Sequence, residues 1–406
     1  MSRVQQFQAP GKLEQRGVTL SRRRLIGRLA AAGFATPVIA SILSESAWTQ
    51  DATPEAATPT PEEVLESLGK RPELIPHGTT NFETPAGLVD GLLTPNELFF
   101  VRSNGPVSMD IDPEAWQLKV NGLVNEELEL SLADLEGMSP RTITAFLECS
   151  GNSRGRYPEE PAIVEGTKWG NGGIGNAEWT GVPVRDILNQ AGIQEGAVDV
   201  VSQGGDFAEM QRGLPIEIAV SPEVMVVWQM NGEPLPNPNG GPVRLLVPGW
   251  GGIASTKWLV GLEIIDQPFQ GSFNTESYII IDEQGAVLRP VWEMPVKSVI
   301  TSPLPDASVP AGAQTIAGYA WSGWGAISKV EVSSDGGANW SEAPIVLEAG
   351  PLSWVRFEQP WEAAAGDAVL MSRATDLRGL TQPEIPDWNI KGYQCNGIYE
   401  VPVSVA

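Results

Sequence analysis

Short apolar runs separated by turns fill most of this sequence and leave little room for long helices. The chain carries 44 glycines and 34 prolines, which favours a β-rich, loop-rich architecture. From Met294 onward the runs recur about every ten residues, which is typical of an immunoglobulin-like sandwich. The expected strands there are Thr315 to Trp321, Ile327 to Ser333 and Ala368 to Thr375, with a hairpin turn at Asp335-Gly336-Gly337.

The part of the chain ahead of that region mixes strand and helix patterns. Trp116 to Val120 and Leu128 to Leu130 predict a hairpin, and Val184 to Ala191 predicts a helix. The sequence therefore predicts an α+β domain over residues 73–293. An all-β immunoglobulin-like domain follows it over residues 294–406.

The N-terminal segment has the pattern of an export signal. Ser21-Arg22-Arg23-Arg24-Leu25-Ile26 is a twin-arginine signature, and Ala30 to Leu43 is a weakly apolar run too short to span a bilayer. We predict a twin-arginine signal peptide over residues 1–46, with a periplasmic or other extracytoplasmic destination. A basic disordered tail is the alternative. Residues 47–72 begin with a Pro/Thr/Ala-rich stretch and predict a flexible linker, in which Pro61 to Leu68 is compatible with one or two helical turns.

Charge and residue usage exclude several classes of function. Lys and Arg number 26 against 50 Asp and Glu, for a net charge of −24, so nucleic acid and anionic membrane surfaces are not expected partners. The single histidine, His77, nearly excludes histidine-based metal sites and Ser–His or Cys–His triads. His77 itself is expected at the surface. The only cysteines, Cys149 and Cys395, fall in different predicted domains, and we expect no bridge between them.

One of these cysteines stands in a stretch suited to a metal–sulfur site. An apolar strand, Thr144 to Glu148, ends at Cys149, and Gly151 and Arg154 follow. The thiolate is a soft metal ligand, the glycine admits a bulky cofactor, and the arginine can hold an oxyanion. A buried core cysteine is the alternative reading. The glycine-heavy segment Trp169 to Trp179 predicts a long functional loop.

An ordered set of segments over roughly residues 75–406 resembles the sulfite oxidase type of molybdopterin enzyme. The turn Pro248-Gly249-Trp250 and the run from Trp321 to Gly337 are most similar to the bacterial sulfite dehydrogenase and SoxC (sulfane dehydrogenase) branch. The segments that carry the resemblance are Leu98 to Arg102, Cys149 to Arg154, Trp169 to Leu188, Met230 to Pro236, Gly241 to Trp250 and Lys257 to Leu259.

The resemblance implies a sulfite oxidase-type molybdopterin domain and a role for each matching residue. Cys149 would be the single protein thiolate on molybdenum, beside the pterin dithiolene. Arg102 and Arg154 would line the oxyanion pocket, with Trp169 packed beside it. The implied cofactor contacts are Phe100, Val101, Arg102, Ser103, Asn104, Asp206, Asn239, Arg244, Ser255, Thr256 and Lys257. Ordinary surface charges remain an alternative for Arg244 and Lys257, and a core position for Trp169.

Several positions depart from the family pattern. Arg102-Ser103-Asn104 stands where the family has Arg-Asn-His, and Asn239 stands where it has a pterin-contacting histidine. Ala254 replaces an arginine. The family's pocket tyrosine has no counterpart, since no tyrosine occurs between Tyr157 and Tyr278. These departures leave the substrate open.

The resemblance implies an enzyme that oxidises sulfite to sulfate by oxygen-atom transfer with a molybdenum–molybdopterin cofactor. The sequence has no Cys-x-x-Cys-His haem motif and too few cysteines for an iron–sulfur cluster, so we expect electrons to pass to an external c-type cytochrome. A homodimer formed through the second domain is also implied, with no stable membrane anchor. The alternatives are a SoxC-like sulfane dehydrogenase acting on protein-bound sulfur, an S- or N-oxide reductase, and a non-catalytic exported binding protein.

Overall fold

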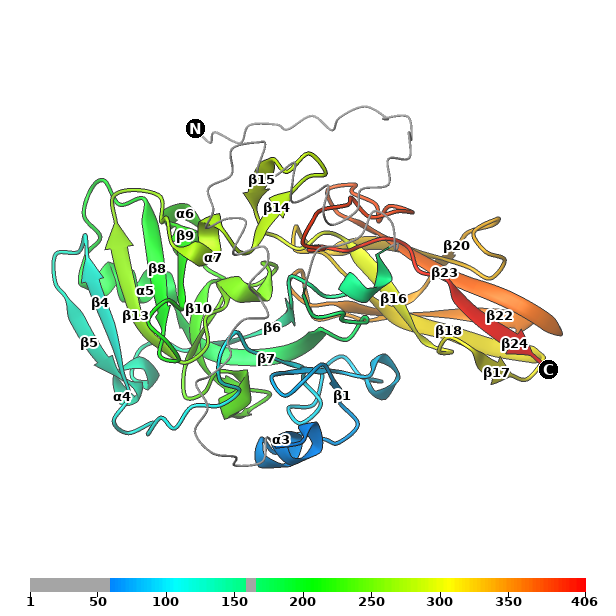
Figure 1. The fold of residues 1–406 in the computed structure, drawn as a ribbon, viewed down its shortest axis with the longest axis horizontal. Helices are drawn as coiled ribbons and strands as arrows, with labels where there is room; N and C mark the ends of the chain where they lie inside the picture. The colour runs from blue at the N-terminus through cyan, green and yellow to red at the C-terminus, as the bar shows by residue number, and fades with distance from the viewer. Residues whose placement is uncertain (1–58, 158–165) are drawn as a thin grey trace.

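The computed structural model describes residues 59–157 and 166–406, which form two lobes side by side (Figure 1). The expected signal peptide lies outside these residues. The expected linker lies partly inside them, and there the prediction is wrong. Helix α3 (Pro61–Ser67) begins with a capping box of Thr60 and Glu63, and its Val64 and Leu65 are buried. Because this helix packs against Phe82, the chain is already part of the globular body there.

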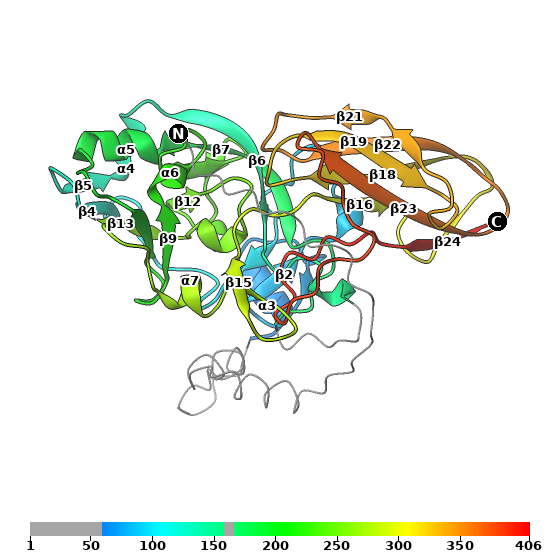
Figure 2. The same cartoon turned by 90° about the horizontal axis from the view of Figure 1, so that it is seen from above.

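The first lobe contains two main sheets and short helices (Figure 2). One sheet has the order β11 (Glu233–Pro234), β10 (Met225–Met230), β7 (Ile174–Pro183) and β6 (Arg141–Glu148), and β12 (Arg244–Leu246) also pairs with β10. The other has the order β5 (Leu128–Ser131), β4 (Gln117–Gly122), β13 (Leu259–Ile265), β8 (Asp199–Gly204) and β9 (Gln211–Pro215). The helices are α4 (Leu132–Glu136), α5 (Val184–Ala191), α6 (Ile216–Ala219) and α7 (Ser272–Thr275). A small third sheet joins β1 (Ile75–Pro76), β2 (Asn81–Glu83) and β3 (Val101–Arg102).

Local patterns predicted several of these elements correctly. The hairpin is β4 paired with β5, and the helix is α5, which ends at Gly192 with a left-handed φ of 72°. The glycine-heavy loop is shorter than expected, because β7 already begins at Ile174 and pairs with β6. Position 175 of this strand is occupied by glycine, because a Cβ there would come within 2.4 Å of the Phe99 ring.

The second lobe is a two-sheet sandwich, as predicted. One sheet has the order β16 (Lys297–Ser302), β18 (Gly312–Trp321), β22 (Val355–Ala363) and β21 (Ile345–Leu347). The other has the order β17 (Ala307–Val309), β24 (Val401–Val405), β23 (Gly366–Asp376), β19 (Ile327–Ser333) and β20 (Ser341–Ala343). Their facing side chains form one buried cluster that includes Ile316, Val330 and Leu370. The hairpin of β14 (Ile279–Ile281) and β15 (Val287–Pro290) precedes this lobe, and the domain boundary at residue 294 stays a prediction.

Apolar side chains from both lobes meet in one cluster. Phe146 and Ile174 of β6 and β7 pack with Val299, Trp321 and Trp354 of the sandwich. The C-terminal end of β6, where Cys149 follows, therefore lies beside the second lobe. Within the described residues, no helix is long and apolar enough to cross a membrane.

Candidate active site

A cavity opens where β6 ends, and most of the predicted site residues line it. Cys149 lies between two adjoining parts of this cavity. The part that we call the cofactor side is lined by residues that include Phe100, Arg102, Ser103, Asn104, Cys149, Asp206, Asn239, Arg244, Ser255, Lys257 and Tyr278. The part that we call the substrate side is lined by residues that include Arg102, Cys149, Arg154, Trp169, Tyr278 and Tyr393.

Two guanidinium groups share the substrate side with the Cys149 thiol. Arg102, at the end of β3, donates from Nη2 to Asn104 Oδ1 at 2.7 Å and from Nη1 to the Ser103 carbonyl. Arg154 is buried and donates from Nε to the Lys391 carbonyl at 2.8 Å. Burial raises the pKa of the Cys149 thiol, and the positive charges of Arg102 and Arg154 act in the opposite direction. The pocket can therefore stabilise negative charge on sulfur or oxygen.

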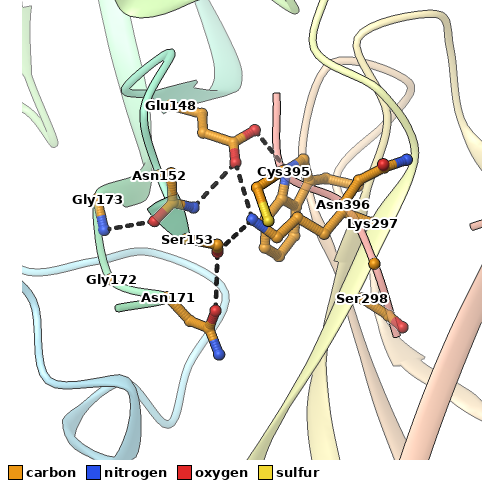
Figure 3. A network of polar contacts seen from close by, with 12 residues as sticks. Glu148, Asn152, Ser153, Asn171, Gly172, Gly173, Lys297, Ser298, Cys395 and Asn396 are labelled. Carbon is orange, nitrogen blue, oxygen red and sulfur yellow. Dashed lines mark hydrogen bonds and ion pairs between the residues drawn. The ribbon is translucent and has the colours of Figure 1, made fainter. Parts of the chain in front are cut away.

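A buried polar network fixes the turn that carries Cys149 (Figure 3). The Glu148 carboxylate accepts from Asn152 Nδ2 at 2.9 Å and from Trp321 Nε1 at 2.8 Å. Lys297 of β16 lies with Nζ 3.5 Å from Glu148 Oε1 and donates to Ser153 Oγ at 2.5 Å. Both charged side chains are only 1% exposed. The second lobe thus anchors the chain on either side of Cys149, through a buried ion pair to Glu148 and a hydrogen bond to Ser153.

The cofactor side concentrates positive charge. Arg244 is buried and donates to the carbonyls of Asn239 and Ser255, at 2.6 and 2.7 Å. Burial lowers the pKa of Arg244 to about 9 and also lowers the pKa of Lys257, which the nearby Arg244 charge depresses further. Arg244 is buried and Lys257 is partly buried, and the hydrogen-bond acceptors of both are neutral oxygens, so this side is suited to an anionic ligand.

Unsatisfied polar atoms show that the cavity fits a large hydrogen-bonding cofactor. Asp206 Oδ1 and Trp169 Nε1 are buried and have no hydrogen-bond partner. Burial raises the pKa of Asp206. No group of three or more His, Cys, Asp or Glu side chains that could hold a metal occurs in the described part of the chain. The cavity offers one sulfur ligand from Cys149, an acceptor from Asp206, a donor from Trp169 and nearby cations. This set matches a group that brings most of its own metal ligands, as molybdopterin does.

Two of the predicted cofactor contacts do not reach the cavity. Val101 points to the opposite side of β3 from its neighbours and packs with Leu65 and Phe82. Thr256 is buried, and its hydroxyl pairs with Ser202 Oγ at 2.7 Å. Trp169 both lines the substrate side and belongs to a buried cluster with Phe100, so its two readings are compatible.

Lys70, which no sequence motif singles out, supports the cofactor side from within the expected linker. Its ammonium group is buried and donates to Asn239 Oδ1 at 2.7 Å and to the carbonyls of Asn96 and Phe99 at 2.6 and 3.1 Å. Asn239 in turn lines the cavity. No local pattern could reveal this contact, because its partners are far along the chain.

Lys70 is expected to make stability depend on pH. Burial lowers the pKa of Lys70 from its usual 10.5 to about 7. Between these values the unfolded chain binds the proton more tightly than the folded chain, so folding stability rises with pH across this window. Urea unfolding between about pH 7 and pH 10 should show this rise in the wild type and a smaller rise in Lys70→Met. The exposed Lys119→Met is the control. An unchanged rise in Lys70→Met would contradict the assignment.

Two tyrosines also reach the cavity, although the sequence comparison left a pocket tyrosine without a counterpart. Tyr278 and Tyr393 line the substrate side, and neither lies in the tyrosine-free stretch between Tyr157 and Tyr278.

His77 is half-buried rather than a surface residue. Its Nε2 lies 2.7 Å from Glu83 Oε2, and its ring centroid lies 5.1 Å from that of Trp169.

Comparisons with known proteins agree with this site. Residues 104–273 match the oxidoreductase molybdopterin binding domain, and residues 289–406 match the Mo-co oxidoreductase dimerisation domain, which supports a homodimer. The chain is 35% identical over 340 residues to sulfite oxidase of Gallus gallus, covering 77% of this chain and 73% of that protein. It is 33% identical over 349 residues to the mitochondrial sulfite oxidase of Homo sapiens, covering 79% and 63%.

The fold has a solved counterpart as well. The crystal structure of the sulfane dehydrogenase SoxCD from Paracoccus pantotrophus matches with a TM-score of 0.74 and 32% identity, over 88% of this chain and 94% of that chain. The Cys149 thiol shares its side of the cavity with two arginines, next to a cationic cavity that fits molybdopterin. The chain therefore belongs to the sulfite oxidase family of molybdopterin-dependent oxidoreductases.

Proposed function

We propose that this enzyme oxidises sulfite to sulfate. The observation that carries the proposal is the pair Arg102 and Arg154 on the substrate side with Cys149, in a chain of net charge −24. A dianion is repelled by the chain as a whole, so a local pair of cations beside the metal ligand indicates that an oxyanion is bound there.

Each residue has a defined task in this reaction. When bound, the molybdenum–molybdopterin group supplies the oxygen-atom transfer and accepts two electrons. Cys149 would hold the metal, and Arg244 and Lys257 would hold the anionic part of the cofactor. Arg102 and Arg154 would bind and orient the sulfite oxygens. The overall reaction consumes sulfite and water and yields sulfate, two protons and two electrons.

The electrons are proposed to leave to a separate c-type cytochrome. The sequence has two cysteines and one histidine, which cannot build a c-type haem or an iron–sulfur site beside the molybdenum ligand. Export by the twin-arginine route to an extracytoplasmic compartment fits both this acceptor and a cofactor loaded before transport. Steady-state reduction of cytochrome c tests the proposal. Sulfite should drive it with the purified molybdenum-loaded protein, and no sulfite-dependent reduction of any acceptor would contradict it.

Removing either pocket arginine should weaken substrate binding. Arg102→Gln and Arg154→Gln are each expected to raise KM for sulfite by about ten- to a hundredfold, because a charged contact in a dry site contributes about 1.5–3 kcal/mol. Arg373→Gln is the control, since Arg373 pairs with Glu331 in the sandwich. Unchanged sulfite kinetics in both pocket variants would refute the oxyanion assignment.

A second candidate is the oxidation of protein-bound sulfur, as the name of the sulfane dehydrogenase neighbour indicates for that protein. The structural match over 88% of this chain favours it. An S- or N-oxide reductase with the same cofactor would run the transfer in the opposite direction. Assays with sulfite, with a persulfide-carrying protein and with dimethyl sulfoxide plus a reduced dye separate the three.

A further inference from the structure

A buried carboxylate holds the loop that carries Trp169. Glu83, at the end of β2, is 4% exposed, and its carboxylate accepts from the backbone N–H groups of Gly170 and Gly172, both at 2.8 Å. A Cβ at position 170 would come within 2.5 Å of Glu83 Oε1, so the lack of a side chain there admits the carboxylate. Charge-assisted hydrogen bonds of this kind are stronger than those between neutral groups. Glu83 therefore fixes the loop backbone next to Trp169.

His77 completes this contact. Its Nε2 lies 2.7 Å from Glu83 Oε2, and its ring centroid lies 5.1 Å from that of Trp169. Burial alone would raise the pKa of Glu83, but the hydrogen bonds from His77 and from the two glycines lower this pKa below its usual value, so the carboxylate is charged. Because a charged carboxylate only accepts hydrogen bonds, His77 donates from Nε2. One imidazole thus contacts both the carboxylate that holds the loop and the side chain that the loop carries.

The loop separates two cavities. Trp169 is fully buried and lines the substrate side with Cys149. His77 and Gly170 line a second cavity of about 310 Å³, which residues of the second lobe also line. This second cavity leaves space into which the loop can move if His77 no longer holds it. The position of the Trp169 ring would then change the width of the substrate side.

The loop keeps other bonds when His77 is replaced. The Gly170 carbonyl accepts from the Ser153 N–H at 2.7 Å, and the Gly173 carbonyl accepts from the Cys149 N–H at 2.8 Å. These bonds join the loop to the turn that carries Cys149, and they do not involve the imidazole. Variants of His77 are therefore expected to fold and to load molybdenum, so that an effect on substrate binding can be measured.

We propose that His77 is a positioning residue for Trp169, which it holds at the substrate side both directly and through Glu83. Without His77 the loop would have to be ordered when an oxyanion binds, which weakens binding. The identity of the oxyanion rests on the proposed function, whereas the contacts of His77 do not.

Two measurements on molybdenum-loaded protein test this role. Inorganic sulfate is titrated calorimetrically into wild type, His77→Leu and His77→Gln, and amide hydrogen exchange over residues 169–173 is followed by mass spectrometry. His77→Leu should weaken sulfate binding about three- to tenfold and speed the exchange over this segment. His77→Gln should restore both, because its amide can donate a hydrogen bond to Glu83 in place of Nε2. Sulfite kinetics of His77→Leu should show a raised KM with kcat nearly unchanged.

The effect on binding should depend on the Trp169 ring. In a Trp169→Ala background, His77→Leu should change sulfate binding less than about twofold. Arg71→Leu is the matched control, because Arg71 lies in the same N-terminal segment and pairs with the exposed Glu73. This control should leave both sulfate binding and the exchange over residues 169–173 unchanged.

Three results would overturn the inference. They are unchanged exchange in His77→Leu, faster exchange with wild-type sulfate binding, and equal losses of binding in His77→Leu and His77→Gln. Faster exchange in His77→Leu that His77→Gln restores, in a protein that neither binds sulfate nor oxidises sulfite, would refute the proposed substrate. That result would leave the role of His77 in holding the loop standing.

Discussion

Cys149→Ser is expected to yield protein that retains little molybdenum and has lost its activity. Cys149 is the proposed metal ligand and lies at the junction of the two sides of the cavity. A serine hydroxyl is a hard, weakly acidic ligand and a poor replacement for a soft thiolate. Activity per chain should fall by at least about a thousandfold, beyond the 10–100-fold typical of residues that only support a metal ligand.

Cys395→Ser is the matched control for this experiment. Cys395 is also free and buried, and its Sγ lies 3.4 Å from the Tyr399 hydroxyl in the second lobe. Molybdenum and sulfite turnover should survive in this variant. Full molybdenum content with normal turnover in Cys149→Ser would show that the metal is held elsewhere.

Among the lysine variants, Lys297→Met is expected to cause the largest loss in the free energy of unfolding. It leaves the Glu148 carboxylate buried without its cation, at 1% exposure. Breaking a buried pair in this way costs about 3–5 kcal/mol, whereas removing both charges is far less harmful. The double variant Glu148→Gln with Lys297→Met should therefore recover at least about half of the loss.

Urea unfolding measures both effects. Lys329→Met is the control, because its partner Glu331 and Lys329 itself are partly exposed, at 17% and 39%, and such a pair contributes less than about 1 kcal/mol. The single variant Lys297→Met should also load less molybdenum, since the network holds the turn that follows Cys149. A loss below about 1 kcal/mol in Lys297→Met would contradict the structural role of the pair.

Elements whose conformation is set by residues close in the sequence could be predicted from the sequence. The helix at Val184 to Ala191 and its glycine stop follow from local backbone preferences. The order of motifs also brought Arg102, Cys149 and Arg154 to one site before any geometry was available. Val101 and Thr256, the two implied contacts that do not line the cavity, each stand between two residues that do, because neighbouring side chains of such a run point to different sides.

The supporting residues could not be predicted, because each acts across a long stretch of chain. Lys70 reaches Asn239, Lys297 reaches Glu148, and Tyr278 reaches Asn104. Lys297 and Tyr278 each stand beside an apolar run and Lys70 stands between Gly69 and Arg71, so nothing in the local sequence marks these side chains as buried. Only the packing of the N-terminal helix, the second lobe and the β14–β15 hairpin against the first lobe gives them partners.

An anaerobic single turnover separates sulfite oxidation at the cofactor from the later transfer of electrons to an acceptor. Protein purified with its cofactor and carrying about one molybdenum per chain is mixed with excess sulfite in the absence of an electron acceptor, and sulfate is quantified. About one sulfate per molybdenum is expected, since the cofactor accepts two electrons once, and none is expected with Cys149→Ser. Fully loaded wild-type protein that forms no sulfate would contradict the proposed sulfite oxidation.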